Sequence, residues 1–217
     1  DLQDISPDRQ YLWMVVFLFT VFRRLSENFC YFCSITQTTK PMSKIALLYA
    51  PKGGSVEVAA QRVEKLYDSS ELDVIEISNF DVKNLVNYEH FILGCSTVGA
   101  ESWEDADSNN EWDRFFHEIQ EQRISLQGKK VAIFGLGNQV LYPDHFVDAM
   151  MILKNESQKH GAEVVGHWPT KGYDFTDSDA VEGDKFVGLA LDEDNEDELS
   201  DQRISEWLKV VKPELEK

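Results

Sequence analysis

Short apolar segments alternate with segments of helical periodicity along most of the chain, and no other feature constrains its fold as strongly. The segments that begin at Ile45, His90 and Lys130 are nearly continuous apolar runs, as in strands buried on both faces. In the segment from Leu72, apolar and polar residues alternate as in a strand, and a fifth strand-like segment begins at Val164. Apolar residues recur at helical spacing over 56–67, 112–119, 146–159 and 204–211. Strands that alternate with helices imply a parallel sheet covered on both faces, so we expect an α/β fold in three layers.

The loops after the strands are the expected ligand loops, because open parallel sheets bind ligands beyond the carboxyl ends of their strands. Those after the first, third and fourth strands are 50–56, 96–103 and 135–146. In the first, Gly53 and Gly54 allow a tight turn into a helix, whose unpaired N–H groups and dipole favour an anion such as phosphate. The Gly-Lys-Ser/Thr signature of nucleoside-triphosphate sites is absent, and a purely structural turn is the alternative.

The other two loops supply polar groups and aromatic rings. Residues 135–139 (GLGNQ) can present backbone amides and carbonyls, and Tyr142 can lie flat against a planar ring or, alternatively, pack on its own helix. The loop after the third strand adds Ser96, Thr97 and the aromatic Trp103. A phosphate cradle, a stacking ring and a polar loop at one edge predict a site for a phosphorylated planar cofactor. No catalytic constellation of nucleophile and base competes with it.

The chain is strongly acidic, with 39 Asp+Glu against 21 Lys+Arg and a formal net charge of -18. This charge argues against nucleic acid as a partner and favours basic protein faces. The acidic stretch 192–198 lacks the glycine and terminal glutamate of a calcium loop, and we interpret it as solvated. Three cysteines, Cys30, Cys33 and Cys95, are too few for a disulfide scaffold and indicate a reducing, cytoplasmic compartment. Cys95 is expected to be a buried apolar residue.

Residues 1–41 differ in composition from the rest, because their net charge is zero and the whole -18 lies in 42–217. The apolar run Leu12–Phe22 is shorter than the roughly 18–20 residues of a membrane span, and its flanking charges are not those of a signal peptide. Met42 resembles a natural start before the first strand. We therefore expect 1–41 to be an extension outside the native domain and 42–217 to be the folded domain. A membrane-surface amphipathic anchor is the alternative for the extension.

Residues 42–211 resemble the long-chain flavodoxins. The resemblance is carried by four motifs, at 128–139 (GKKVAIFGLGNQ), 142–149 (YPDHFVDA), 168–175 (WPTKGYDF) and 186–195 (FVGLALDEDN). It implies a flavodoxin-like three-layer sandwich with a five-stranded parallel sheet of order 2-1-3-4-5, in which the insertion 168–186 interrupts the fifth strand. It also implies non-covalently bound FMN and one-electron transfer between redox enzymes, by a carrier without a substrate of its own rather than by an enzyme.

By position, the resemblance assigns the flavin-stacking ring to Tyr142 and the other cofactor contacts to the three loops. The contacts are Pro51, Lys52, Gly53, Gly54, Ser55 and Val56 in the phosphate loop, Ser96, Thr97, Val98 and Gly99 in the second loop, and Leu136, Gly137, Asn138, Gln139, His145 and Phe146 in and after the third.

Four positions depart from the family pattern. Ser55 is the only hydroxyl in a phosphate loop that is usually rich in them. Val98 stands where an aromatic residue often covers the second flavin face, so that Trp103 is the nearest aromatic candidate. Asn138 replaces a common aspartate, and Leu141 replaces a usual glycine. A flavodoxin-like regulatory or interaction module with weakened FMN binding is therefore the alternative function, and a flavin-dependent reductase is a third.

Burial of a flavin ring in an acidic protein opposes the negative charge that reduction adds, which predicts a low reduction potential. The expected partners are basic-faced redox proteins, namely a reductase donor and an oxidoreductase acceptor. We expect neither a nucleic acid nor a membrane as partner, and we expect a monomer.

Overall fold

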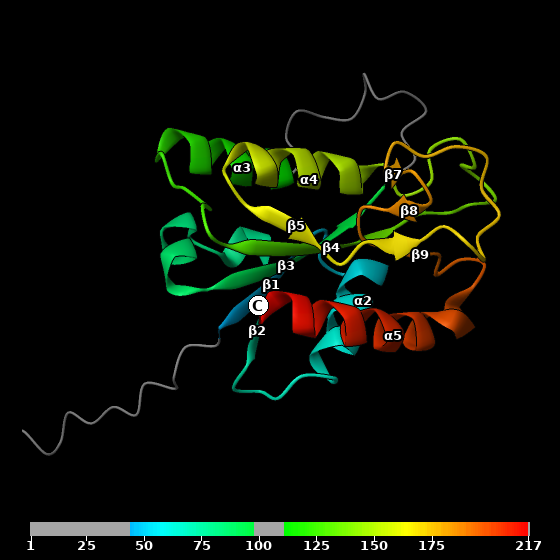
Figure 1. The fold of residues 1–217 in the computed structure, drawn as a ribbon, viewed down its shortest axis with the longest axis horizontal. Helices are drawn as coiled ribbons and strands as arrows, with labels where there is room; N and C mark the ends of the chain where they lie inside the picture. Colours follow the sequence, from blue (N-terminus) through cyan, green and yellow to red (C-terminus); the bar gives the residue numbers. More distant parts are fainter. Residues whose placement is uncertain (1–43, 98–110, 217) are drawn as a thin grey trace, which may run out of the picture. The chain divides into compact units, whose positions relative to one another are not determined.

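The computed structural model describes residues 44–97 and 111–216 of the chain. A twisted parallel sheet lies at the centre of this part (Figure 1). Its strands lie in the order β2-β1-β3-β4-β5, which confirms the predicted order. The bounds are β1 Ile45–Tyr49, β2 Leu72–Glu76, β3 His90–Ser96, β4 Lys130–Leu136 and β5 Glu163–Val165.

The fifth strand is interrupted, as predicted. Strand β5 pairs with the first half of β4, and a separate strand, β9 (Leu189–Leu191), pairs with the second half of the same strand. The chain rejoins the sheet at Gly188, where a Cβ atom would lie 2.2 Å from the carbonyl oxygen of Ile133. Only glycine allows so close an approach, so this residue lets the strand resume beside β4.

The segment between the two halves forms a second, small sheet. Its strands are β6 (Trp168–Pro169), β7 (Val181–Glu182) and β8 (Lys185–Phe186), which pair antiparallel in the order β6-β8-β7. Aromatic rings with centroids 5.2–5.8 Å apart hold this insertion to the domain; they belong to Phe146, Tyr173, Phe175 and Phe186. The insertion is therefore packed structure with its own aromatic core.

Helices cover both faces of the sheet and complete the three predicted layers (Figure 1). One face carries α2 (Ser55–Glu64) and α5 (Asp197–Leu215), and the other carries α3 (Glu111–Glu121) and α4 (Ala149–Lys159). Two short 3-10 turns, η1 (Ile77–Asn79) and η2 (Val82–Asn87), join β2 to β3. Each face has its own apolar core, since alternate side chains of the buried strands point to opposite helix layers.

One predicted boundary is wrong. The periodicity places a helix from residue 146, but α4 begins at Ala149. Val147 has a φ of 55°, in the left-handed region that a β-branched residue rarely adopts. A helix cannot pass through this conformation, so residues 143–148 remain a turn that belongs to the site described below.

Among the helices of the described residues, none is long and apolar enough to cross a membrane. Cys95 is buried, as predicted, and burial raises the pKa of its thiol to about 12. Several predictions fall outside the described residues; these concern 1–41 with Cys30 and Cys33, and Val98, Gly99 and Trp103 in the second loop.

Candidate functional site

The carboxyl ends of the central strands meet at one edge of the sheet. Ser96 at the end of β3 is in register with Leu136 at the end of β4, and Leu136 is in register with Leu191 at the end of β9. A cavity of about 210 Å³ opens at this edge. Its lining comes from the loops that follow four strands and comprises Ser55, Ser96, Thr97, Leu136, Gly137, Asn138, Leu141, Tyr142, Glu193 and Asp194. The cavity therefore lies at the predicted edge, and residues from all three predicted loops line it.

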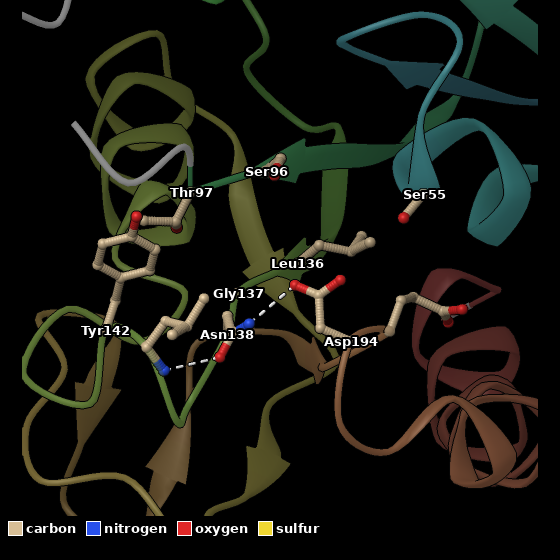
Figure 2. A pocket seen from close by; sticks show the side chains of 10 residues that line it. Ser55, Ser96, Thr97, Leu136, Gly137, Asn138, Tyr142 and Asp194 are labelled. Atoms are coloured by element: carbon tan, nitrogen blue, oxygen red, sulfur yellow. Dashed lines mark hydrogen bonds between the residues drawn. The ribbon is translucent and has the colours of Figure 1, made fainter.

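Tyr142 lies at one side of the cavity and Ser55 lies at the other (Figure 2). The Tyr142 side chain is 39% exposed, so its ring is available to a ligand rather than buried against the helix that follows. Its backbone N–H donates to the carbonyl of Asn138 at 2.9 Å, which turns the chain back towards the pocket. The site thus offers one accessible aromatic ring from the loop in which the sequence placed it.

Asn138 shapes the loop that carries this ring. Its side-chain oxygen accepts hydrogen bonds from the backbone N–H groups of Val140 (3.1 Å) and Leu141 (2.8 Å). Asparagine favours such local turns because its amide replaces a backbone partner. Val140 and Leu141 are consequently held at the tip of the loop, where their side chains are 64% and 69% exposed.

Gln139 does not line the cavity. It is buried; its backbone N–H donates to Asp192 at 3.0 Å, and its side-chain oxygen accepts from the backbone N–H of Asp174 at 2.6 Å. The residue therefore joins the third loop to the acidic stretch on one side and to the insertion on the other.

The acidic stretch that the sequence predicted to be solvated is partly structural and forms one wall of the pocket. Asp192 is fully buried and accepts hydrogen bonds from Gln139, Asp194 and Asn195, which compensate the loss of its hydration. Glu193 lines the pocket and forms an ion pair with Arg62 of α2 at 2.7 Å. These residues follow β9 directly, so the resumed fifth strand was the sequence signal that could have placed them at the site.

Of the residues predicted in the first loop, one lines the cavity. Ser55 lines the cavity, but Val56 is buried in the core, and Pro51, Lys52, Gly53 and Gly54 are exposed residues outside the cavity lining. Gly54 is the N-cap of α2 and provides no capping side chain, so the N–H groups of the first turn remain available to an external acceptor.

Glu57, in the first turn of α2, already takes one donor of this loop. Its Oε2 atom accepts the backbone N–H of Gly53 at 2.7 Å. Burial of the Tyr49 hydroxyl first, and then the negative charge of Glu57, raise the pKa of Tyr49. The turn that was expected to attract an anion thus contains an anionic side chain of its own.

The second loop is described only at its start. Ser96 and Thr97 line the cavity. The Thr97 hydroxyl also accepts the backbone N–H of Ala149 at 3.1 Å, which satisfies one of the free donors at the start of α4. The cofactor contacts expected from Val98 and Gly99, and the second-face role of Trp103, stay predictions.

The insertion holds the turn 143–148 in place. Thr176 and Asp177 donate their backbone N–H groups to the carbonyl of Pro143, and Asp179 donates to Asp148 at 2.8 Å. Asp148 is also 3.0 Å from the ring of His145, and burial raises the pKa of this carboxyl group. The structure places His145 in this supporting pair.

Phe146 lies in the aromatic core between the turn and the insertion, and it is fully buried. Neither His145 nor Phe146 lines the cavity. His145 contacts Asp148 within the turn, and Phe146 packs against the insertion.

The arrangement fits a flat, phosphorylated ligand. An accessible ring, small polar groups and the start of a helix surround the cavity, and its 210 Å³ is below the roughly 300–1,000 Å³ of whole-ligand pockets. The cavity formed by the described residues therefore has room for only part of a nucleotide-sized ligand. Within the same residues, no group of three or more His, Cys, Asp or Glu could hold a metal ion.

Comparison with known proteins agrees with this geometry. The family model described as Flavodoxin matches residues 47–207. The chain is 42% identical to a flavodoxin of Synechocystis sp. over 176 residues, which cover 81% of this chain and 99% of that protein. It is 35% identical to a flavodoxin of Klebsiella pneumoniae over 175 residues, or 80% of this chain and 96% of the relative.

Among solved structures, it is similar to a Fusobacterium nucleatum flavodoxin bound to flavin mononucleotide. The TM-score is 0.70 and the identity 28%, over 80% of this chain and 99% of that one. The interrupted fifth strand agrees with the long-chain form of the fold. The chain belongs to the flavodoxin family.

Proposed function

We propose that this flavodoxin carries one electron at a time between redox enzymes on non-covalently bound FMN, without a substrate of its own. The observation that carries the proposal is the cavity with the accessible ring of Tyr142 at one side and Ser55, at the start of α2, at the other (Figure 2). These two sides suit the two ends of FMN, a flat ring system and a terminal phosphate. The cofactor supplies the redox chemistry, and the protein binds and orients it.

The phosphate end would be held chiefly by the backbone. The first-turn N–H groups of α2 and the Ser55 hydroxyl are the donors, and Lys52 is an exposed cation in the same loop. Pro51, Gly53, Gly54 and Val56 would contribute through the path of their main chain. Because one of the loop donors is taken by Glu57, we expect this end of the site to bind more weakly than its backbone geometry alone would allow.

The ring end would be held by stacking on Tyr142 and by polar groups around the cavity. Ser96, Thr97, Leu136, Gly137 and Asn138 line it beside Tyr142. The carboxylate of Asp194 at the cavity opposes the addition of negative charge to the ring, and the net charge of -18 acts in the same direction, whereas Glu193 is paired with Arg62. Both effects support a low reduction potential, so the protein would act as a strong electron donor.

Two finer assignments rest on charge and composition. The net charge of -18 supports redox partners with basic faces, one reductase and one acceptor oxidoreductase. The low cysteine content supports a cytoplasmic location. We further propose that the protein is a monomer and that 1–41 lies outside the native domain 42–217.

The alternative is a regulatory or interaction module of the same fold that binds FMN weakly. The contact between Glu57 and the Gly53 amide, together with a single hydroxyl in the phosphate loop, favours this alternative. Such a module would fold and bind its partner proteins without flavin, which distinguishes it from an electron carrier.

The absorption spectrum of the purified protein tests the proposal. We expect flavin bands at a ratio of one FMN per chain, release of FMN rather than riboflavin on denaturation, and uptake of two electrons in separate one-electron steps during anaerobic titration. A colourless protein that takes up no FMN when the cofactor is added in excess would overturn the proposal and leave the interaction module.

A further inference from the structure

Hydrogen bonds between side chains join two loops at the site. The Asn138 Nδ2 donates to Asp194 Oδ2 at 2.9 Å, across 56 residues of sequence, as Figure 2 shows. In return, Asn195 Nδ2 donates to Asn138 Oδ1 at 3.0 Å. We call the contact between Asn138 and Asp194 the clasp. It connects the loop after β4 with the loop after β9, and both of its residues line the cavity.

Each end of the clasp is anchored to a shaped turn. On the β4 side, Asn138 Oδ1 also accepts the N–H groups of Val140 and Leu141, immediately before Tyr142. On the β9 side, the Asp194 N–H donates to Asp192 at 3.2 Å, and Asp192 in turn holds Gln139. A shift of either turn would therefore be transmitted to the other, and through Asn138 to the chain that carries Tyr142.

The clasp requires at least one amide, because one of its two side chains must donate. An amide presents both an oxygen and an N–H donor, whereas a carboxylate at neutral pH only accepts. Asn138 uses its oxygen for the loop and its N–H for Asp194. An aspartate at this position would keep the loop contacts, but it would face Asp194 as a second negative charge and could donate nothing to it.

We propose that Asn138 is a positioning residue, and that the amide–carboxylate clasp with Asp194 holds the Tyr142 loop in the conformation that binds the flavin ring. This inference rests on the proposed function. In this chain the Asn138 amide acts through the pairing across the two loops, and not through a direct contact with the cofactor. It follows that the pairing can be reversed, with the carboxylate at 138 and the amide at 194, without loss of binding.

The test is a set of four variants in FMN titrations of the apoprotein, followed by flavin fluorescence. Asn138→Asp is expected to bind FMN about tenfold more weakly, because it loses a hydrogen bond and gains like-charge repulsion. Asp194→Asn keeps a partner for the Asn138 amide and is expected to stay within about threefold of the parent. The matched control is Asp144→Asn, which removes an exposed carboxylate from the same loop and should behave like Asp194→Asn.

The reversed pair, Asn138→Asp with Asp194→Asn, decides the inference. We expect it to recover FMN affinity to within about threefold of the parent. If it binds as weakly as Asn138→Asp alone, the Asn138 amide contacts the cofactor directly, and the clasp is not what positions the loop. The same result for Asn138→Asp and the parent would also overturn the inference.

A second readout does not depend on flavin. Urea unfolding is measured for the apoproteins of the parent, Asn138→Asp, Asp194→Asn and the reversed pair. The clasp predicts that the changes in the free energy of unfolding are non-additive, with the reversed pair more stable than the sum of the single changes allows. If the parent takes up no FMN, the proposed function fails, and this cycle still measures the clasp. Additive unfolding energies would show that the two side chains do not interact.

Discussion

Replacement of Glu57 by glutamine is expected to tighten the binding of FMN. Glu57 bonds to the backbone N–H of Gly53 at 2.7 Å, in the turn where the phosphate of the cofactor would lie. Its carboxylate therefore competes for a donor and repels the phosphate. Glutamine has the same size and can still accept from Gly53, so the substitution removes the charge and leaves the shape of the turn.

The magnitude follows from the exposure of this turn. Two unit charges 4 Å apart interact by about 1 kcal/mol in bulk water and by about 4 kcal/mol at the effective dielectric constant of a protein surface. Since the contact between Gly53 and Glu57 is exposed, the lower end applies. A phosphate monoester carries about two charges at neutral pH, which gives roughly 1–2 kcal/mol, or about five- to thirtyfold in the dissociation constant.

Riboflavin separates this effect from a general change of the site. It has the same ring system and no phosphate, so Glu57→Gln should alter its dissociation constant by less than about twofold. Isothermal titration of the apoprotein with each ligand, at low and at moderate salt, provides the comparison. Glu64→Gln is the control, because it removes an exposed carboxylate from the other end of the same helix.

Two results would refute the reasoning. If Glu57→Gln binds FMN no more tightly than the parent does, the carboxylate does not compete with the phosphate, and its bond to Gly53 only shapes the turn. If FMN and riboflavin gain equally, the change acts on the ring end of the site. An equal gain in Glu64→Gln would indicate that net charge alone, rather than the position of Glu57, sets the affinity.

Four further outcomes are expected. Tyr142→Ala should weaken FMN binding about five- to hundredfold in a fluorescence titration, because a lost stacking contact costs roughly 1–3 kcal/mol; parent-like affinity would remove Tyr142 from the ring. Turnover with a basic-faced reductase, measured below saturation, should fall as salt rises, since ions screen attraction to a protein of charge -18; a rate independent of salt would contradict this. A chain of residues 42–217 should show the circular dichroism and FMN content of the whole chain, and an unfolded or flavin-free product would place 1–41 within the domain. In a chain with Cys30→Ser and Cys33→Ser, a thiol reagent at pH 8 should label Cys95 only after denaturation, because burial raises its pKa to about 12 and keeps it in the unreactive thiol form; rapid labelling of the native protein would be inconsistent with that burial.

The layers and the edge that carries the cavity could be predicted from the pattern of the sequence, whereas the order of the sheet came from the resemblance to the flavodoxins. Strands buried on both faces are continuous apolar runs, and these are visible without any tertiary contact, as at 45–49 and 130–136. The placement of Ser55, Ser96, Thr97, Leu136, Gly137, Asn138 and Tyr142 around one cavity follows from the rule that ligand loops lie at the carboxyl edge of a parallel sheet. Local pattern was sufficient for these residues because their position depends only on which strand they follow.

The roles of individual side chains within those loops depended on partners far away in sequence. Gln139 and Phe146 look like site residues by position, but Asp192, Asp174 and the aromatic core of the insertion turn both inward. The left-handed Val147 similarly moves the start of α4, against a periodicity that favours helix from 146. Such contacts arise from the register of the resumed fifth strand against β4, and a pattern of neighbouring residues carries no information about register.

The acidic stretch shows the same division. Its composition indicates a solvated segment, and composition alone cannot separate Asp192, which is buried, from Asp194, which faces the cavity. The pairing of β9 with β4 places this stretch beside the third loop, within hydrogen-bond distance of Asn138 and Gln139. The sequence by itself therefore determined the fold and the location of the candidate site. Tertiary structure alone decided which carboxylates hold the site together, because hydrogen bonds are made between atoms that only folding brings within 3 Å of one another.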